Sequence, residues 1–271
     1  MSAMFLTPSP PSSFQLASDE VHCWRASLDV PPETFARLYA TLTPDERTRS
    51  ARFHFERDRQ RFIGARGVLR DLLGRYLQTQ PRQIRFVYNA FGKPDLGPEF
   101  VSRLKFNLSH SAGLALIAIT TASNVGVDLE YIRAQSDYAD IARRFFSVAE
   151  LDYLSALPGH RYAEAFFSCW TKKEAYLKAR GEGLATPLNS FSVPLTTDPA
   201  HTHVDLCGGW SLYTLRPAPG YAGALAIEGT GWRLRQWQWK NLAMSSERRD
   251  TIESASNSRS DDCAMRLAYT A

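Results

Sequence analysis

The sequence predicts an α+β fold with two similar halves, each built from a helix followed by three or four strands. In the first half, apolar residues recur at helical spacing over residues 57–77, and short strand-like runs follow. In the second half, residues 162–179 predict another such helix, and a second set of strand-like runs comes after it. Residue-level similarity between the halves is low, so the repeat is one of architecture.

The chain divides into four segments. Residues 1–19 are rich in Ser and Pro and contain no Lys or Arg, which predicts a disordered leader and argues against a secretory signal. Residues 20–123 and 124–243 are the two α+β halves. Residues 244–271 turn to Ser, Arg, Asp and Glu with few aliphatic residues, which predicts a flexible tail.

The composition is that of a cytoplasmic globular protein. Hydrophobic residues make up 44% of the chain and charged residues 22%, and the longest apolar runs are far too short to span a bilayer. The 4 cysteines have neither CxxC nor His-paired spacing, which argues against a zinc site or a disulfide framework. A net charge of +4 allows an acidic partner or a polyphosphate ligand, but no long Lys/Arg run predicts nucleic acid binding.

The first half begins with a strand over residues 21–30 and a helix over residues 32–39. Thr43 predicts the cap of a second helix, because Pro44 follows in the first helical position and Glu46 stands three residues after the cap.

The long helix over residues 57–77 carries Arg61, Arg66 and Arg70 at helical spacing. We interpret these arginines as a solvated basic flank. The strands expected after this helix are residues 84–88, 104–108, 113–120 and 125–129.

The second half begins with helices over residues 138–157 and 162–179. Gly181 stands where a left-handed cap would end the second of these. The strands expected next are residues 191–193, 210–215, 222–227 and 232–239.

One carboxylate occupies an unusual place on the helix over residues 162–179. At about 100° per residue, Glu174 lies near the middle of an apolar face. That face is formed by Ala163, Phe166, Phe167, Trp170 and Leu177. Burying an unpaired carboxylate costs on the order of several kcal/mol, so Glu174 requires a proton or a partner. Lys178 points the same way one turn later, and an ordinary i,i+4 pair is the simpler interpretation.

Two further carboxylates, Asp128 and Glu130, share one face of the strand that begins at residue 125. Gly126 in this strand predicts that another part of the protein approaches its backbone closely. Alone they are typical of a polar strand end. Together with Glu174 they form an all-oxygen donor set, which favours Mg²⁺ over zinc. Lys178 beside them would neutralise a phosphate.

A cluster of hydroxyls and one imidazole follows the strand that ends near residue 108. Ser109, His110 and Ser111 would bind a phosphate, or they form a β-turn with local side-chain caps, and both interpretations remain open. A Ser-His nucleophilic pair is less attractive, because neighbours in sequence seldom have the required geometry.

The order and spacing of five motifs resemble those of the 4′-phosphopantetheinyl transferases of the large single-chain type. The motifs are Phe91–Pro94, Phe106–Ser111, Gly126–Glu130, Arg144–Ser147 with Glu150, and Trp170–Lys178. The resemblance runs from about residue 21 to residue 240, and it is the ordered combination that is specific. It implies two α+β halves related by a pseudo-twofold axis, with the active site in the cleft between them.

Members of that family move the phosphopantetheine arm of coenzyme A to a serine of a carrier protein and release 3′,5′-ADP. The resemblance implies that Asp128, Glu130 and Glu174 hold Mg²⁺ with the coenzyme A pyrophosphate. Lys178 would contact the phosphate and assist the leaving group. The proton of the serine would go to Glu130, to Glu174 or to a water, and the sequence does not choose among them.

The nucleotide end of coenzyme A, with its 3′-phosphate, would be bound by Lys93 in its Gly-Lys-Pro backbone, by Ser109 with His110, and by Arg61. Basic residues after Pro44 usually serve the 3′-phosphate in this family. Glu46 stands where many relatives have a basic residue, so the choice among Arg47, Arg49 and Arg52 stays open.

The partners implied are acidic acyl or peptidyl carrier proteins of polyketide, nonribosomal peptide or fatty-acid synthesis, and a monomer is expected. The mild basic charge suits such partners through electrostatic steering. Two other functions would use the same residues. One is a Mg²⁺-dependent phosphohydrolase or nucleotidyl transferase that needs no carrier, and the other is a coenzyme A-binding regulator without enzyme activity.

Overall fold

A computed structural model describes residues 14–100, 104–121, 123–133, 138–195, 203–206 and 208–240. Most of the predicted leader and all of the predicted tail lie outside these residues.

In the first half, the elements are β1 (Glu20–Ser27), α1 (Pro32–Ala40), α2 (Pro44–Ser50), α3 (Glu56–Leu77), a 3₁₀ helix (Pro81–Gln83), β2 (Phe86–Tyr88), β3 (Pro94–Leu96), β4 (Leu104–Ser111) and β5 (Leu114–Thr121). In the second half they are β6 (Val125–Tyr131), α4 (Tyr138–Phe145), α5 (Val148–Ser155), α6 (Gly159–Arg180), 3₁₀ helices (Gly183–Ala185 and Leu188–Ser190), β7 (His203–Leu206), β8 (Trp210–Leu215), β9 (Tyr221–Glu228) and β10 (Arg233–Gln238).

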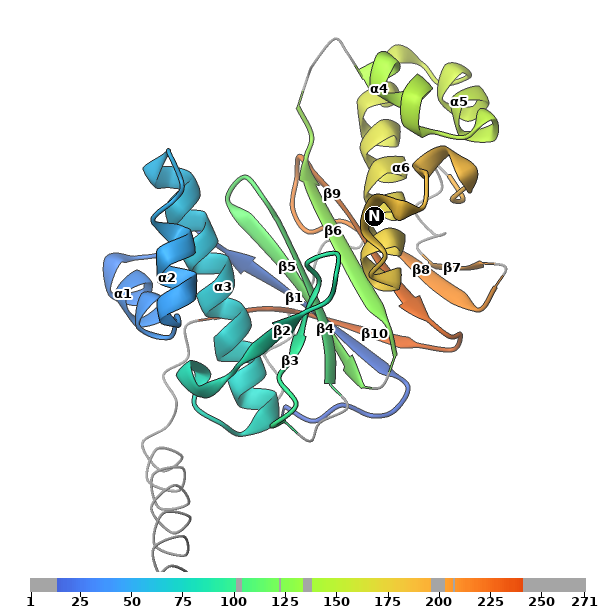
Figure 1. Cartoon of the computed structure of the whole chain (residues 1–271). Helices are drawn as coiled ribbons and strands as arrows, with labels where there is room; N and C mark the ends of the chain where they lie inside the picture. Colours follow the sequence, from blue (N-terminus) through green and yellow to red (C-terminus); the bar gives the residue numbers. More distant parts are fainter. Residues whose placement is uncertain are drawn as a thin grey trace, which may run out of the picture.

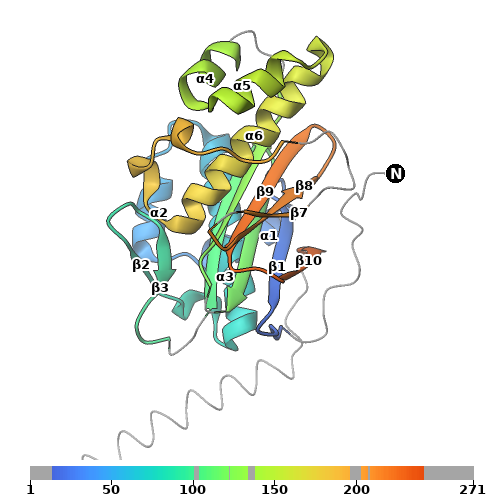
Figure 2. The same cartoon turned by 90° about the vertical axis from the view of Figure 1, so that its right-hand side faces the viewer.

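Two four-stranded sheets form the centre of the molecule. The first has the strand order β10-β1-β5-β4 and the second the order β6-β9-β8-β7, while β2 and β3 make a separate hairpin. Helix α3 packs on the first sheet and α6 on the second, with α4 and α5 at the far end of α6 (Figure 1). Figure 2 shows α6 lying across the face of the second sheet. The predicted α+β fold with two similar halves is confirmed. Within the described part of the chain, no helix has the length and apolar character needed to cross a membrane.

The last strand returns to the first half. Strand β10 pairs in parallel with β1, in a register that joins Trp237 to Trp24. Trp239 follows the strand, and its indole N–H donates a 2.8 Å hydrogen bond to the carboxylate of Asp71 on α3. The predicted division near residue 123 therefore leaves one strand of the second segment in the sheet of the first.

Capping chemistry sets two helix starts. Thr43 and Glu46 form the predicted capping box of α2. Ser147 and Glu150 form a second capping box, which starts α5. The prediction of one continuous helix over residues 138–157 is wrong for this reason, because the second cap divides that segment into α4 and α5.

The end of the predicted leader is ordered. The ring of Phe14 stacks on Trp24 with 5.6 Å between the ring centroids and meets Tyr76 edge-on at 5.4 Å. Residues 14–19 are described, and Phe14 and Leu16 pack against the first core. The prediction of disorder is therefore wrong for these last six residues of the leader.

The predicted basic flank of α3 is wrong for two of its three arginines. Arg66 is 7% exposed and Arg70 is 1% exposed. Arg70 Nε donates a 2.8 Å hydrogen bond to Glu46 Oε2, and its Nη1 donates to the carbonyls of Pro81 and Ile84. Arg66 Nε lies 3.6 Å from the other oxygen of the Glu46 carboxylate. Glu46 is thus the shared counter-ion of two buried arginines as well as a helix cap.

Candidate active site

Strands β4 and β6 lie side by side but belong to different sheets (Figure 1). We call the junction between β4 and β6 the seam, and side chains on β4 form hydrogen bonds across it. Asn107 Oδ1 accepts the Val127 N–H at 2.9 Å, and the Ser109 hydroxyl donates to Asp128 Oδ1 at 3.0 Å. The Ser111 hydroxyl donates to the Glu130 carboxylate at 3.0 Å and accepts the N–H of the next residue, Tyr131.

This seam corrects the prediction for residues 106–111. The strand does not end near residue 108 but continues to Ser111, and the predicted β-turn is wrong. Alternate residues of a strand share one face, so Asn107, Ser109 and Ser111 all point toward β6. Their polar side chains form hydrogen bonds with strand β6 and do not cap a turn.

Asp128 is the centre of the charge cluster. Its side chain is buried, and Oδ1 accepts the Lys178 ammonium at 2.5 Å together with the Ser109 hydroxyl. The other oxygen, Oδ2, is buried and has no hydrogen-bond partner. A buried carboxylate oxygen without a donor is costly, which indicates that a cation or donor completes it.

Glu130 and Glu174 lie within electrostatic reach of Asp128. Burial raises the pKa of the Glu174 carboxyl, and the charge of Asp128 raises it further, whereas Lys178 lowers it. For Glu130 the pKa is also raised, first by burial and then by Asp128, while the Ser111 hydroxyl and Lys178 lower it. A divalent cation would relieve the unfavourable effect of the Asp128 charge on Glu130 and Glu174.

The fit to a metal ion rests on these groups. No three His, Cys, Asp or Glu side chains in the described ranges stand close enough to make a ready-made metal cage. Lys178 instead provides the positive charge at Asp128. The donor set is nonetheless all oxygen, and Asp128 Oδ2 is free of other hydrogen bonds, so the residues present fit Mg²⁺ better than a metal that prefers nitrogen or sulfur.

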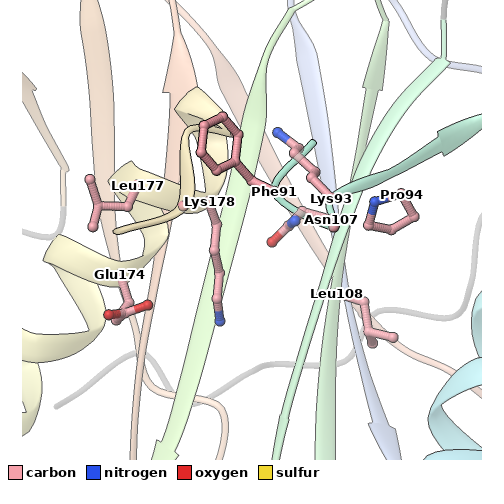
Figure 3. Close-up of a pocket in the computed structure, with 11 residues that line it drawn as sticks. Phe91, Lys93, Pro94, Asn107, Leu108, Glu174, Leu177 and Lys178 are labelled. Carbon is pink, nitrogen blue, oxygen red and sulfur yellow. The ribbon is translucent and has the colours of Figure 1, made fainter. Parts of the chain in front are cut away.

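A cavity of about 270 Å³ opens beside this cluster, between the two halves (Figure 3). Glu174, Leu177 and Lys178 of α6 form one side, and Glu174 and Lys178 extend from the helix next to each other. The other side is formed by Phe91, Gly92, Lys93, Pro94, Asn107 and Leu108. Apolar and charged groups therefore meet in one cavity, as a ligand with a base and phosphates would require.

The residues predicted for the nucleotide end are placed as follows. Lys93 lines the cavity, and its ammonium donates to the carbonyls of Val125 and Ala179. Ser109 is buried in the seam. His110 is exposed by surface area, yet loss of solvation in the cleft lowers its pKa, and the charges of Lys178, Arg61 and Arg66 lower it further.

The three arginines after Pro44 differ in their surroundings. Arg47 lies over the Tyr39 ring at 4.8 Å and reaches the carbonyls of Tyr39 and Ala40, away from the carboxylates. Arg49 is exposed, lies over the Phe62 ring and is close enough to Arg66 to affect its pKa. Arg52 is exposed.

The sequence analysis missed a buried ion pair behind α6. The Lys173 ammonium is fully buried and pairs with Glu150 Oε2 at 2.8 Å. It also donates to the carbonyls of Leu188 and Phe191, and Val193 N–H donates to the other Glu150 oxygen. The predicted strand over residues 191–193 is wrong, because these backbone groups are taken by side chains. Both residues stand in the family motifs, and Glu150 has capping-box spacing from Ser147, but nothing in the sequence pairs Glu150 with Lys173.

Gly126 allows α6 to lie directly on β6. A Cβ atom at Gly126 would overlap the carbonyl oxygen of Ala175 and the amide nitrogen of Ala179, and would lie 2.9 Å from the Ala179 Cα. All these atoms belong to helix backbone, which cannot move without moving Glu174 and Lys178. The close approach that the glycine predicts is made by the helix that carries the site.

Gly126→Ala should therefore displace α6. We expect the free energy of unfolding to fall by about 1–3 kcal/mol or more, since overpacking against backbone cannot be relieved by a rotamer change. Urea unfolding measures this loss. Gly159→Ala is the matched control, because a Cβ there meets nothing within 4 Å. Equal stabilities of the two variants would contradict the packing argument.

The fold and the site together define an enzyme that handles phosphate groups in a cleft between two α+β halves. Comparison with known proteins identifies it further. A model of the 4′-phosphopantetheinyl transferase superfamily matches residues 124–225, and a model of a 4′-phosphopantetheinyl transferase N-terminal domain matches residues 23–122.

Similar proteins share this family. The chain is 44% identical over 234 residues to the 4′-phosphopantetheinyl transferase HetI of Nostoc sp., covering 86% of this chain and 97% of that protein. It is 31% identical over 192 residues to the 4′-phosphopantetheinyl transferase Sfp of Bacillus subtilis, covering 70% and 83%. A putative 4′-phosphopantetheinyl transferase of Synechocystis sp. is 38% identical over 150 residues, covering 55% and 61%.

The chain belongs to the 4′-phosphopantetheinyl transferase superfamily and is of the Sfp-like type. It is an enzyme that transfers phosphopantetheine from coenzyme A to carrier proteins, in a family that is generally metal-dependent. The family and the activity predicted from the motifs are confirmed.

Proposed function

We propose that the cleft between the halves binds coenzyme A with Mg²⁺, held by Asp128, Glu130 and Glu174, for transfer of the phosphopantetheine arm to an acidic carrier protein. The observation that carries this proposal is the buried Asp128 Oδ2, which has no hydrogen-bond partner, on a carboxylate whose charge raises the pKa of both Glu130 and Glu174. Bound there, Mg²⁺ would neutralise negative charge on the pyrophosphate as the bond to the arm breaks.

Each residue has a part in the transfer. The carrier serine attacks the phosphorus that bears the arm, and 3′,5′-ADP leaves. Lys178, released from Asp128, would pair with the leaving phosphate. Glu130 or Glu174 would accept the serine proton, because a carboxylate whose pKa is raised is the stronger base. Ser111 keeps Glu130 oriented through its hydrogen bond.

The nucleotide end would occupy the cavity. Its base would lie among Phe91, Pro94 and Leu108, against the backbone at Lys93. The 3′-phosphate would be held on the His110 side, with Arg61 and Arg49 as the predicted ligands, whereas the Ser109 hydroxyl is already donated to Asp128. Burial lowers the pKa of His110 most, and the charges of Lys178, Arg61 and Arg66 lower it further. The positive charge gathered around His110 favours an anion there and supports this placement.

Arg61→Gln tests this placement. We expect the KM for coenzyme A to rise about tenfold or more, because a hydrogen bond to a charged group is lost. The KM for dephospho-coenzyme A, which lacks the 3′-phosphate, should stay unchanged. Arg57→Gln, on the same helix with a 73% exposed side chain, is the control. An equal rise for both substrates would contradict a role at the 3′-phosphate.

The proposal includes a monomeric cytoplasmic enzyme whose partners are carrier proteins rather than nucleic acid or membrane. An assay with coenzyme A and Mg²⁺, with and without apo-carrier protein, separates it from the alternatives. The transferase should release 3′,5′-ADP only when a carrier is present. Release without a carrier would support a phosphohydrolase, and tight binding without turnover on any carrier would support a regulator.

A further inference from the structure

One loop of the first half is fastened to the second half. Residues 89–93 connect β2 to β3, and together with Pro94, the first residue of β3, they form a loop of residues 89–94 that reaches the C-terminal end of α6. Asn89 Nδ2 donates a 2.7 Å hydrogen bond to the Gly181 carbonyl, and Lys93 Nζ donates to the carbonyls of Ala179 at 2.9 Å and Val125 at 3.2 Å. Two side chains thus tie this loop to the end of α6 and the start of β6.

Asn89 also shapes the loop. Its Oδ1 accepts the N–H groups of Phe91 and Lys93, each at 2.9 Å. The backbone at Gly92 has a φ of 80°, which suits glycine. Asn89 therefore stabilises the conformation of the loop and also forms one of its contacts with the end of α6.

The Lys93 ammonium is directed at backbone rather than at a carboxylate. Asp95, the acidic residue whose charge acts on Lys93, is paired with Lys105. Burial lowers the pKa of Lys93 to about 8, with Asp95 raising it and Lys105 lowering it. The Ala179 carbonyl belongs to the last turn of α6, where unsatisfied carbonyls carry partial negative charge and a cation is favoured. This contact is an electrostatic cap on the helix of Glu174 and Lys178.

The fastened loop forms a wall of the nucleotide cavity. Phe91, Lys93 and Pro94 line it opposite Glu174 and Lys178. The loop and the segment after α6 are in close contact, since a Cβ at Gly181 would lie 3.1 Å from Lys93 Cδ and one at Gly183 would lie 3.2 Å from Phe91 Cδ1. The width of the cavity therefore depends on how firmly the loop is held to α6.

We propose that Lys93 is a positioning residue, whose ammonium ties the loop of residues 89–94 to the end of α6 and so sets the width of the nucleotide cavity without contacting a phosphate. The inference rests on the proposed binding of coenzyme A in this cavity. The backbone of the loop would contact the ligand, while the Lys93 side chain contacts the other half of the protein.

Binding measured by calorimetry in the presence of Mg²⁺ tests this role. Lys93→Met keeps the length of the side chain and removes its charge and donors. We expect the Kd to rise about tenfold for coenzyme A and by the same factor for dephospho-coenzyme A, since the loss is one of cavity shape. The kcat at saturating coenzyme A should stay within about twofold of wild type. A loss confined to coenzyme A would overturn the inference, because it would show a 3′-phosphate contact.

Asn89→Ala supplies the second, independent variant, and it keeps the test valid if Lys93→Met does not fold. It should raise the Kd for both ligands to a similar extent. The rise in Kd for the double variant should be far smaller than the product of the two single-variant rises, because the two residues hold the same loop. An unchanged Kd for both ligands in folded Asn89→Ala would overturn the inference. Wild-type protein that failed to bind coenzyme A would instead overturn the proposed function.

Discussion

Replacement of Asp128 by alanine should lower the rate of phosphopantetheine transfer at least ~10²-fold, the loss typical of an electrostatic contact at the reacting group. Asp128 touches both Ser109 and Lys178, and its charge raises the pKa of both Glu130 and Glu174. Its removal would take away a metal ligand and leave Lys178 without its partner. Steady-state transfer to an apo-carrier at saturating coenzyme A and Mg²⁺ measures the effect.

The same loss is expected for Glu174→Ala and Lys178→Ala. Asp152→Ala, at an exposed position on α5, is a suitable control that should leave the rate unchanged. Far-UV circular dichroism of each variant separates loss of the site from loss of the fold. Full activity of Glu174→Ala with Mg²⁺ and coenzyme A would show that the metal assignment is wrong.

Replacement of Lys173 by methionine should lower the free energy of unfolding by about 3–5 kcal/mol, the cost of leaving one member of a buried ion pair without its partner. Glu150 would then be a buried carboxylate with backbone N–H donors but without a cation, and the carbonyls of Leu188 and Phe191 would lose the donor that Lys173 provides. Urea unfolding at neutral pH measures the change.

Two further variants give this prediction its controls. Lys105→Met breaks the exposed pair with Asp95 and should cost no more than about 1 kcal/mol. Glu150→Gln combined with Lys173→Met should recover part of the stability, because no unpaired charge is then buried. A loss below about 1 kcal/mol for Lys173→Met alone would contradict the structural role of the pair.

The sequence predicted elements best where the signal is local. The cap at Thr43, the glycine that ends α6 and the close approach at Gly126 are each decided by a few adjacent residues, and the structure confirms all three. The motif order predicted the family, because the arrangement of Asp128, Glu130 and Glu174 along the chain is characteristic even where their geometry is not known.

The predictions that were wrong concern partners far away in the sequence. Helical spacing placed Arg66 and Arg70 on a polar face, but Glu46 of another helix accepts their charge and makes burial possible. Residues 107–111 have the polar composition of a turn, and only the neighbouring strand β6 explains why they form a strand. Local propensity contains no information about such pairings.

The same limit applies to the sheets. The parallel pairing of β10 with β1 joins residues more than two hundred positions apart, and nothing near either strand predicts it. For the site, the sequence located the carboxylates and Lys178 but not their supports. Lys173 and Glu150 hold the segment after α6, and Lys93 caps the end of the helix. Both lysines stand in the family motifs, but the local sequence does not show that their ammonium groups are directed at backbone carbonyls.

Intact-mass analysis tests the central claim most directly. A panel of acidic apo-carrier proteins is incubated with the enzyme, coenzyme A and Mg²⁺, and a parallel set contains EDTA in place of the metal. The account predicts a gain of roughly 340 Da, the mass of the phosphopantetheine arm, on at least one carrier, and no gain with EDTA. Unchanged masses across the panel, or an equal gain with EDTA, would contradict it.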